Sequence, residues 1–456
     1  MIPLLQRSTR PFPSREFLSF AISRLRNFEP ILSKLMLRLW DRWRNILAIG
    51  VGGSAGRNRF PPFSAFEWRP ESIIRSWPAA AAIAMRFQAA VMGYGRLHDI
   101  DEADFIVRQR EPFNAEPRSQ RLIEQYVTPQ SLLYVRSHGA TPQLDEDHAL
   151  EVSGADLRTA TLTLADLKAS FPERRIISAM QCAGNRRADL QSVRKTNGDP
   201  WDVGAIGNVD WTGVSLADVL LALGVGDRRD GYVVCTAADV DEIDGETHPY
   251  GISISLKRAM AGDVLIAWAI GGEPLSPAHG APMRLVVPGY AGVRSAKWLT
   301  RIELRDEPSD APIQAKDYKL FPPDEDGSDV DWRTGLVIEA MPVNSAICDP
   351  RDGDTLPAGM VTIYGYALAY GRRVARVDLS LDGGACWVRA QFIDEDAAPD
   401  AWQRWQCTAE LAPGRHQLVV RAIDEAGQLQ PECAQDVWNF AGYLSTAWHR
   451  ITVDAQ

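Results

Sequence analysis

The segment 176–187 constrains the fold more than any other part of the chain. It begins with a short apolar run, Ile176–Met180, of the kind that forms a buried strand. Cys182 follows, and the next three residues, Ala-Gly-Asn, favour a sharp turn. Arg186 and Arg187 come directly after that turn. The sequence therefore predicts a strand that ends at a cysteine, with two permanent cations beside it.

This arrangement suits a metal ligand next to an anion pocket. Nearby cations favour the thiolate form of a cysteine, and a thiolate is a soft metal ligand. Guanidinium groups offer planar, forked donors to small anions. The alternative is a buried structural cysteine beside two surface arginines, which is the commoner environment for a single cysteine. From this segment alone, both interpretations stay open.

Residues from about 101 to 328 have the pattern of a compact domain with mixed strands and helices. Thr163 and Asp166 form a capping-box pattern that predicts a helix over 164–170. Ser215 and Asp218 repeat the pattern before a second helix, and Gly224 sits where that helix should end. Apolar segments between these helices predict strands at Tyr232–Cys235, Val264–Ile270 and Arg284–Val287. We expect an α+β fold with a mixed α/β layer.

The periodicity changes after a loop-rich linker at 306–335, which contains Asp306–Asp310 and Pro322–Gly327. Beyond it, Ala375, Val377, Leu379 and Leu381 alternate with polar residues, and Asp382–Gly384 supplies a hairpin turn. Further short strands are predicted at Val361–Tyr366, Gln417–Ile423 and Arg450–Val453. The segment 329–456 is therefore predicted to form an immunoglobulin-like β-sandwich.

The first 100 residues resemble neither region. The first 45 of them are richer in arginine than in acid and have apolar residues at roughly helical spacing, which fits a targeting segment or an extension without a fold of its own. Gly50–Ala55 fits a loose dinucleotide-binding pattern, but Pro61 and Pro62 follow where a helix is needed. Pro78–Tyr94 is too short for a membrane span and contains Arg86.

Charge and cysteine usage narrow the class of protein. The net charge of −10 argues against nucleic acid as the main partner. Six cysteines lack the spacing of a zinc site or of a disulfide framework. We therefore expect a reducing compartment and a cytoplasmic protein without a membrane span, although the arginine-rich N-terminus leaves targeting to an organelle open.

The segment Gln181–Arg187 resembles the molybdenum-ligand segment of the sulfite oxidase family of molybdopterin enzymes. Four further segments resemble that family in the same order along the chain: Tyr134–Gly139, His279–Trp298, Asp317–Lys319 and Leu444–Arg450. The resemblance runs from about residue 101 to the C-terminus. It implies a molybdopterin-binding catalytic domain followed by a dimerisation sandwich.

The resemblance also implies a set of cofactor contacts. Cys182 would supply the protein sulfur to molybdenum, alongside the two dithiolene sulfurs of molybdopterin. The remaining cofactor-binding positions are Tyr134, Val135, Arg136, Ser137, His138, Asp239, His279, Arg284, Ser295, Ala296 and Lys297. The chain is offset by one residue near Asp239, so Asp241 is the alternative carboxylate.

The family resemblance implies five residues around the substrate: Arg136, Arg187, Trp201, Tyr318 and Arg404. Arginine forks suit an oxyanion such as sulfite. Arg404 is displaced by one position from the family pattern, and its alternative role is a cation stacked on Trp402 or Trp405.

The implied reaction is oxidation of sulfite to sulfate by oxygen-atom transfer, with electrons passing to an external acceptor such as dioxygen or a cytochrome. Because only His98 precedes Arg136, no haem domain is expected. Reduction of nitrate or an S-oxide is the alternative enzyme, and a non-catalytic molybdopterin-binding or interaction protein is the third interpretation. A homodimer through the sandwich is expected, with Trp438 and Phe440 either at the interface or in the sandwich core.

Overall fold

The computed structural model describes residues 101–456 except 146, 244 and 395. The predictions made for residues 1–100, including the loop Gly50–Ala55, the segment Pro78–Tyr94 and His98, lie outside the described residues.

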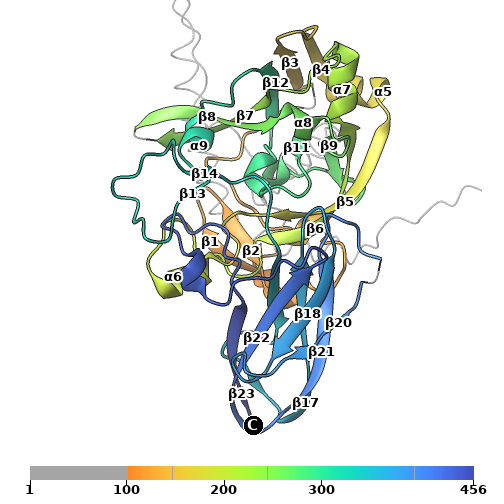
Figure 1. The fold of residues 1–456 in the computed structure, drawn as a ribbon. Coiled ribbons are helices and arrows are strands. Elements are labelled where there is room, and N and C mark those ends of the chain that lie inside the picture. Colours follow the sequence, from red (N-terminus) through yellow and green to blue (C-terminus); the bar gives the residue numbers. More distant parts are fainter. Residues whose placement is uncertain (1–100, 146, 244, 395) are drawn as a thin grey trace, which may run out of the picture. The chain divides into compact units, whose positions relative to one another are not determined.

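The α+β region contains two sheets that follow the predicted strands (Figure 1). The first has the order β10–β9–β6–β5 with β11 beside β9, and the second has the order β4–β3–β12–β7–β8. Neighbouring strands are antiparallel except β3 and β12, which are parallel. The strands are β3 (Ala149–Gly154), β4 (Ala160–Thr163), β5 (Glu173–Gln181), β6 (Ile206–Ser215), β7 (Tyr232–Ile243), β8 (Glu246–Ser255), β9 (Leu265–Ile270), β10 (Glu273–Pro274), β11 (Arg284–Val286) and β12 (Leu299–Arg305).

Strand β5 confirms the strand predicted before Cys182, and it is longer than the apolar run alone. Its last four residues are buried, and it pairs with β6 along its whole length. Every residue of β6 is buried, because β6 is a central strand between β5 and β9. Cys182 therefore leaves β5 from inside the protein.

The helices of this region are short, and their ends test the capping predictions. They are α4 (Ser119–Leu122), α5 (Leu164–Ser170), α6 (Arg187–Val193), α7 (Leu216–Leu223), α8 (Leu256–Ala259) and α9 (Pro312–Ala315). The capping box of Thr163 and Asp166 is confirmed at α5, and Gly224 ends α7 in the left-handed conformation. The box predicted at Ser215 is wrong: its side chain makes no cap hydrogen bond, because Ser215 still belongs to β6 and its hydroxyl is buried.

The C-terminal region is the predicted sandwich, drawn in blue in Figure 1. One sheet has the order β15–β17–β21–β20, and the other has the order β16–β23–β22–β18–β19. Apolar residues from both sheets, such as Ile363, Trp405, Leu418 and Val453, form one buried cluster. The strands are β15 (Asn344–Asp349), β16 (Thr355–Leu356), β17 (Gly359–Leu368), β18 (Val374–Ser380), β19 (Val388–Arg389), β20 (Gln391–Phe392), β21 (Gln403–Leu411), β22 (Gly414–Asp424) and β23 (His449–Ala455).

The alternation predicted along β18 is wrong at its start. Ala375 is exposed and Val374 is buried in its place, because the register with β22 shifts between Val374 and Arg376. Asp378, expected on the polar face, is buried and forms ion pairs with Arg376 and Arg421. A bulge of this kind cannot be read from alternation alone.

Small elements complete the described chain. Both loop motifs of the predicted linker are loops, but helix α9 and strand β13 lie between them, and β13 pairs with β14. The short strands are β1 (Phe105–Gln109), β2 (Asn114–Pro117), β13 (Lys319–Leu320) and β14 (Leu336–Val337). The 3-10 helices are η4 (Glu102–Asp104), η5 (Gln130–Leu132), η6 (Pro277–His279), η7 (Gly292–Arg294) and η8 (Ala434–Val437).

The two regions share buried contacts. Ala179 and Ile206 cluster with Tyr366 and Trp402 of the sandwich strands and the loop before β21. Trp438 and Phe440 are also buried, but they pack on Leu190 of α6 and on Phe321, so they neither fill the sandwich core nor face a free surface. Within the residues that the structure describes, no helix is long and apolar enough to cross a membrane.

Candidate functional site

A cavity collects most of the predicted site residues. The predicted residues that line it are Tyr134, Arg136, Ser137, His138, Cys182, Asp239, His279, Arg284, Ser295, Lys297 and Tyr318. They come from segments that are far apart in the sequence, between β2 and β13. The fold therefore brings the thiol, three cationic groups and a carboxyl group to one enclosed space.

Cys182 enters this cavity from the end of β5. Its backbone N–H donates a hydrogen bond to the Ala205 carbonyl at 2.9 Å, which fixes the position of the turn. The Gly184 N–H approaches the Cys182 Sγ at 3.4 Å. A backbone donor directed at the sulfur helps to fix its position in the cavity.

Lys297 is the most firmly held cation of the cavity. Its Nζ donates to Ser137 Oγ at 2.8 Å and to the carbonyls of Arg136 and Ala278 at 3.0 Å each. Burial lowers the pKa of Lys297 to about 7. A bound anion would favour the charged amine and raise this pKa again.

Arg284 is a second buried cation on the same side. Its guanidinium donates to the carbonyls of His279 at 3.0 Å and Ser295 at 2.9 Å. Burial lowers the pKa of Arg284 to about 10, so it stays charged at neutral pH. The Arg284 Cζ also lies over the Trp211 ring, 5.0 Å from its centroid. This cation–π contact helps to hold the guanidinium in place.

Two buried polar atoms of the cavity residues have no hydrogen-bond partner in the described part of the chain: His279 Nε2 and Asp239 Oδ1. Buried polar atoms are nearly always paired, so these two indicate a missing ligand. His279 Nδ1 is 2.9 Å from Ser276 Oγ, and burial lowers the pKa of His279 to about 3. Burial raises the pKa of Asp239 to about 6.

The donor set of this end of the cavity fits molybdopterin. Lys297 and Arg284 suit a phosphate, while a neutral imidazole and a carboxyl suit the polar atoms of a pterin. Asp239 lines the cavity, whereas Asp241 is partly exposed and does not. Of the two carboxylates predicted as alternatives, the structure therefore brings Asp239 to the site.

The other end of the cavity carries Arg136, His138 and Tyr318. Tyr318 adopts a left-handed backbone conformation, with φ of 51°, and its hydroxyl is 2.9 Å from His138 Nε2. Burial holds the pKa of His138 well below its usual range, so the imidazole is neutral. The Arg136 Nη1 donates to the Ser137 carbonyl. This end therefore offers a guanidinium and a phenol to a small oxyanion.

Arg187 and Trp201 do not line the cavity. Arg187 is buried and donates to the carbonyls of Gly442 at 3.0 Å and Asp199 at 2.9 Å. Trp201 is fully buried in the cluster that contains Cys182, and its Nε1 has no described hydrogen-bond partner. Both residues form a layer behind the cavity wall.

Three predicted residues have other surroundings. Val135 forms an isolated β-bridge with Ala115, and the Ala296 carbonyl accepts a hydrogen bond from the Leu285 N–H. Arg404 is not brought to the cavity: it donates to both carboxylate oxygens of Asp394, at 3.0 and 2.8 Å.

The alternative role for Arg404, stacking on Trp402 or Trp405, is not seen in the described residues either. A charged, bidentate pair with Asp394 is stronger than stacking on an indole, which explains the observed choice.

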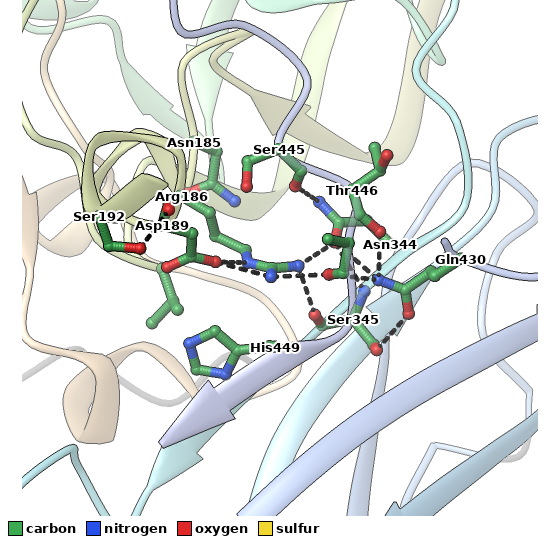
Figure 2. Close-up of polar contacts among 12 residues, drawn as sticks. Asn185, Arg186, Asp189, Ser192, Asn344, Ser345, Gln430, Ser445, Thr446 and His449 are labelled. Atoms are coloured by element: carbon green, nitrogen blue, oxygen red, sulfur yellow. Dashed lines mark hydrogen bonds and ion pairs between the residues drawn. The ribbon is translucent and has the colours of Figure 1, made fainter. Parts of the chain in front are cut away.

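Arg186 links the cysteine turn to the C-terminal region (Figure 2). It is completely buried and has φ of 64° at the start of α6. Its guanidinium donates to Asp189 Oδ2 at 2.7 and 2.9 Å, to Asn344 Oδ1 at 2.7 Å, and to the Ser345 and Ala447 carbonyls. The turn that carries Cys182 is therefore tied to both regions.

Sequence reasoning missed several residues of the site. Tyr250 lines the cavity and donates from its hydroxyl to the Val293 carbonyl at 2.6 Å. Gly292 leaves room for Tyr134, since a Cβ there would be 2.9 Å from the Tyr134 hydroxyl. Gly292 lies inside a segment that already matched the family, so it could have been found. Tyr250 stands on a strand with no such signal.

Side chains alone provide few metal ligands. Among the described residues, no group of three or more His, Cys, Asp or Glu side chains is arranged to hold a metal ion. A metal at Cys182 would therefore take its remaining ligands from a cofactor or from water.

Both regions of the chain are similar to known proteins. Residues 138–313 match the oxidoreductase molybdopterin binding domain, and residues 336–456 match the Mo-co oxidoreductase dimerisation domain. Sulfite oxidase of Gallus gallus is 41% identical over 352 residues, which cover 75% of this chain and 76% of that protein. Mitochondrial sulfite oxidase of Homo sapiens is 41% identical over 362 residues, which cover 76% of this chain and 65% of that protein. The matched region is thus just under two thirds of the human protein.

A solved structure supports the architecture. The sulfane dehydrogenase SoxCD of Paracoccus pantotrophus is 24% identical, with a TM-score of 0.65, and the match covers 77% of this chain and 88% of that chain. At this identity the likeness concerns the fold. It confirms the predicted α+β domain followed by a β-rich C-terminal domain.

Proposed function

Because this chain belongs to the sulfite oxidase family of molybdopterin oxidoreductases, we propose that it oxidises sulfite to sulfate at a molybdenum centre bound through Cys182. One observation carries the proposal: a single cavity contains the Cys182 thiol, two buried cations, and the unpaired atoms His279 Nε2 and Asp239 Oδ1. These groups suit a cofactor that has a phosphate, a pterin and a metal.

The cofactor end of the cavity would hold molybdopterin. Lys297 and Arg284 would bind its phosphate, while His279 and Asp239 would pair with its polar atoms. Cys182 would supply the protein sulfur to the metal. When bound, the cofactor supplies the two-electron redox centre and the oxygen atom that sulfite gains.

The substrate end would bind and orient the oxyanion. Arg136 offers a forked guanidinium, and its positive charge offsets the repulsion between a sulfite dianion and an electron-rich metal centre. The Tyr318 hydroxyl, held 2.9 Å from His138 Nε2, would add one hydrogen bond at a fixed place. Arg187 donates hydrogen bonds to the carbonyls of Gly442 and Asp199 and does not line the cavity. Its positive charge would still add to the attraction of the cavity for an anion.

The two electrons would pass to an external acceptor, either dioxygen or a cytochrome, without a haem bound to this chain. The purified protein should therefore lack haem absorption and still reduce ferricyanide when sulfite is added. A haem spectrum that changes on addition of sulfite would contradict this route.

A substrate panel on molybdenum-loaded protein tests the proposed function. Sulfite should drive the reduction of ferricyanide, whereas nitrate and S-oxides should be poor oxidants of the chemically reduced protein. Preferred turnover of nitrate or an S-oxide would replace sulfite oxidation with the reductase. Stoichiometric molybdenum without turnover of any of them would indicate a non-catalytic binding protein.

We also propose three functional parts of the chain: an N-terminal extension at 1–100, a catalytic domain at 101–328 and a dimerisation sandwich at 329–456. The two domain matches, at 138–313 and 336–456, support the second and third parts. A protein that begins at residue 101 should bind the cofactor and oxidise sulfite normally. Loss of sulfite oxidation with normal cofactor content would assign a role to the extension.

The dimerisation-domain match also supports a homodimer. Because Trp438 and Phe440 are buried against α6 and Phe321, the dimer would use other surfaces of the sandwich. Light scattering at micromolar concentration should give twice the mass of the chain, and a monomer mass would contradict the dimer.

For the compartment, we propose a reducing one such as the cytoplasm. All six cysteines lie in the described part of the chain and none is in a disulfide, which supports this proposal. Fractionation of cells should place the protein with cytoplasmic markers, and recovery with an organelle would assign a targeting role to the N-terminal segment.

A further inference from the structure

Tyr443 connects two residues of the substrate end although it does not line the cavity itself. Its ring is stacked on the ring of Tyr318, with centroids 4.8 Å apart and planes 18° apart. The same ring lies 5.5 Å from the Arg187 Cζ. One half-buried side chain from the C-terminal region thus touches both the phenol and one of the arginines assigned to the substrate.

The backbone around Tyr443 is fixed in place. The Tyr443 N–H donates a hydrogen bond to Asn439 Oδ1 at 2.9 Å, and Asn439 Nδ2 donates one to the Tyr443 carbonyl at 2.7 Å. The next residue, Leu444, donates its N–H to the carbonyl of Ala183 at 2.8 Å, and Ala183 directly follows Cys182 in the sequence. Gly442 provides the carbonyl that holds Arg187. The ring therefore projects from a segment that is bonded to the cysteine turn.

Gly442 shows how close this approach is. It has φ of 66°, and a Cβ at its position would be 2.7 Å from side-chain atoms of Arg187. Glycine is needed there for both reasons: the conformation is left-handed, and the guanidinium packs directly on the backbone. The segment and Arg187 consequently move as one unit.

Tyr318 is buried, and two aromatic rings contact its phenol: His138 in an edge-to-face arrangement and Tyr443 in a stack. Its hydroxyl has the one contact with His138, and its backbone is in a left-handed conformation that a tyrosine rarely adopts. The stacked ring covers one face and so fixes the direction in which the phenol points. Without that cover, the hydroxyl would occupy a range of positions around His138.

We propose that Tyr443 is a positioning residue, whose ring orients Tyr318 and Arg187 and thereby sets the affinity for the oxyanion substrate. This inference rests on the proposed function, since it assigns sulfite to the end of the cavity that Tyr318 and Arg136 line. The ring, and not the hydroxyl, carries the effect, because the stack, the cation contact and the packing against the apolar core all involve the ring.

Two variants of Tyr443 separate the ring from the hydroxyl. Tyr443→Leu removes the stack but keeps an apolar side chain of similar reach, and Tyr443→Phe keeps the ring. Loss of an aromatic stack corresponds to a change of about threefold to tenfold. Tyr443→Leu should raise the KM for sulfite by about that factor, with a smaller change in kcat. Tyr443→Phe should restore the wild-type KM.

Two controls separate positioning from general damage. Molybdenum content and the melting temperature should be nearly unchanged in both variants. Tyr364→Leu, which removes a half-buried tyrosine of β17 in the sandwich, should leave the KM for sulfite unchanged.

A crystal structure of Tyr443→Leu gives a readout that does not depend on turnover. The distance between the Tyr318 hydroxyl and His138 Nε2 should lengthen beyond 2.9 Å, or the phenol should occupy more than one position. An unchanged KM with an unmoved Tyr318 would overturn the inference. If the wild-type protein fails to oxidise sulfite at all, the proposed function fails, while the position of Tyr318 still decides whether Tyr443 orients it.

Discussion

The two ends of the cavity are built in different ways. At the cofactor end, Lys297 and Arg284 are held by carbonyls and a hydroxyl of the α+β domain itself. At the substrate end, Tyr318 and Arg187 rest on Tyr443 and Gly442, which belong to the C-terminal region. The difference indicates that the two cations proposed to bind the cofactor phosphate are held within the α+β domain, whereas residues proposed to bind the substrate also contact the C-terminal region.

Arg186 connects the turn that carries Cys182 with the C-terminal region. It sits four residues after Cys182, yet its hydrogen bonds reach Asn344, Ser345 and Ala447 of the C-terminal region (Figure 2). A change in the sandwich can therefore reach the cysteine turn and Arg187 first, before it reaches Lys297 or His279.

The largest effect should come from Cys182, which both ends need. Cys182→Ser should keep the fold and lower the rate of sulfite oxidation by more than about a hundredfold. Loss of a residue that only hydrogen-bonds to a metal ligand costs about tenfold to a hundredfold, and loss of the ligand itself should cost more. Steady-state reduction of ferricyanide on protein of measured molybdenum content checks it. A serine variant with more than a small fraction of wild-type turnover would remove Cys182 from the centre.

Arg136 tests the substrate end alone. Arg136→Gln should raise the KM for sulfite by roughly a hundredfold, because a charge-assisted bidentate contact contributes about 2–3 kcal/mol. Cofactor content should stay normal, since the Lys297 contact uses the Arg136 backbone carbonyl and not its side chain.

Arg404→Gln is the matched control for Arg136, because Arg404 was assigned to the substrate from sequence but pairs with Asp394 in the structure. This variant should lower the melting temperature and leave the KM for sulfite unchanged. An equal loss of affinity in both variants would contradict the assignment of the two arginines.

Arg186→Met tests the link between the two regions. Removing this guanidinium leaves Asn344 Oδ1 and Asp189 without their main donor and should lower the free energy of unfolding by about 2 kcal/mol, the loss expected for hydrogen bonds to a charged group. The KM for sulfite should rise more than the Kd for the cofactor changes. Urea unfolding, together with titration of cofactor-free protein, measures both. A cofactor site that weakens as much as the substrate site would show that the two ends are not built independently.

Lys297 tests the cofactor end through the change of stability with pH, which is small within any one pH unit. Its pKa is about 7 in the folded protein and near its ordinary value when unfolded, so the unfolded state binds more protons between these two values. The free energy of unfolding of cofactor-free protein should therefore rise with pH above about 7, by about 1.4 kcal/mol per pH unit at most. Lys297→Met should lack this part of the rise, and bound cofactor should flatten it because its phosphate favours the charged amine. Identical pH profiles for wild type and Lys297→Met would contradict a buried, partly neutral lysine.

The fold could be predicted well where local chemistry decided it. The capping box at α5 and the glycine that ends α7 each depend on a few adjacent residues. The predictions failed at Ser215 and Ala375, where pairing between distant strands outweighed the local pattern. A register shift depends on the partner strand, which the local sequence does not contain.

The same distinction applies to the site. Residues within matched segments, such as Cys182, His279 and Lys297, were found because the segment itself carries the signal. Arg404 was assigned to the substrate from its position in the sequence, but in the structure its guanidinium pairs with Asp394. The residues next to Arg404 in the sequence do not predict that pairing. Tyr250 and Tyr443 were missed because only the folded chain brings them beside His138 and Tyr318.

The number of sulfur atoms around molybdenum tests the central assignment most directly. X-ray absorption at the molybdenum edge of the loaded wild-type protein should give three sulfur neighbours, two from the dithiolene and one from Cys182. Cys182→Ser, loaded in the same way, should give two. The same sulfur count in both proteins would show that Cys182 is not a ligand, and the proposed site would then be wrong at its centre.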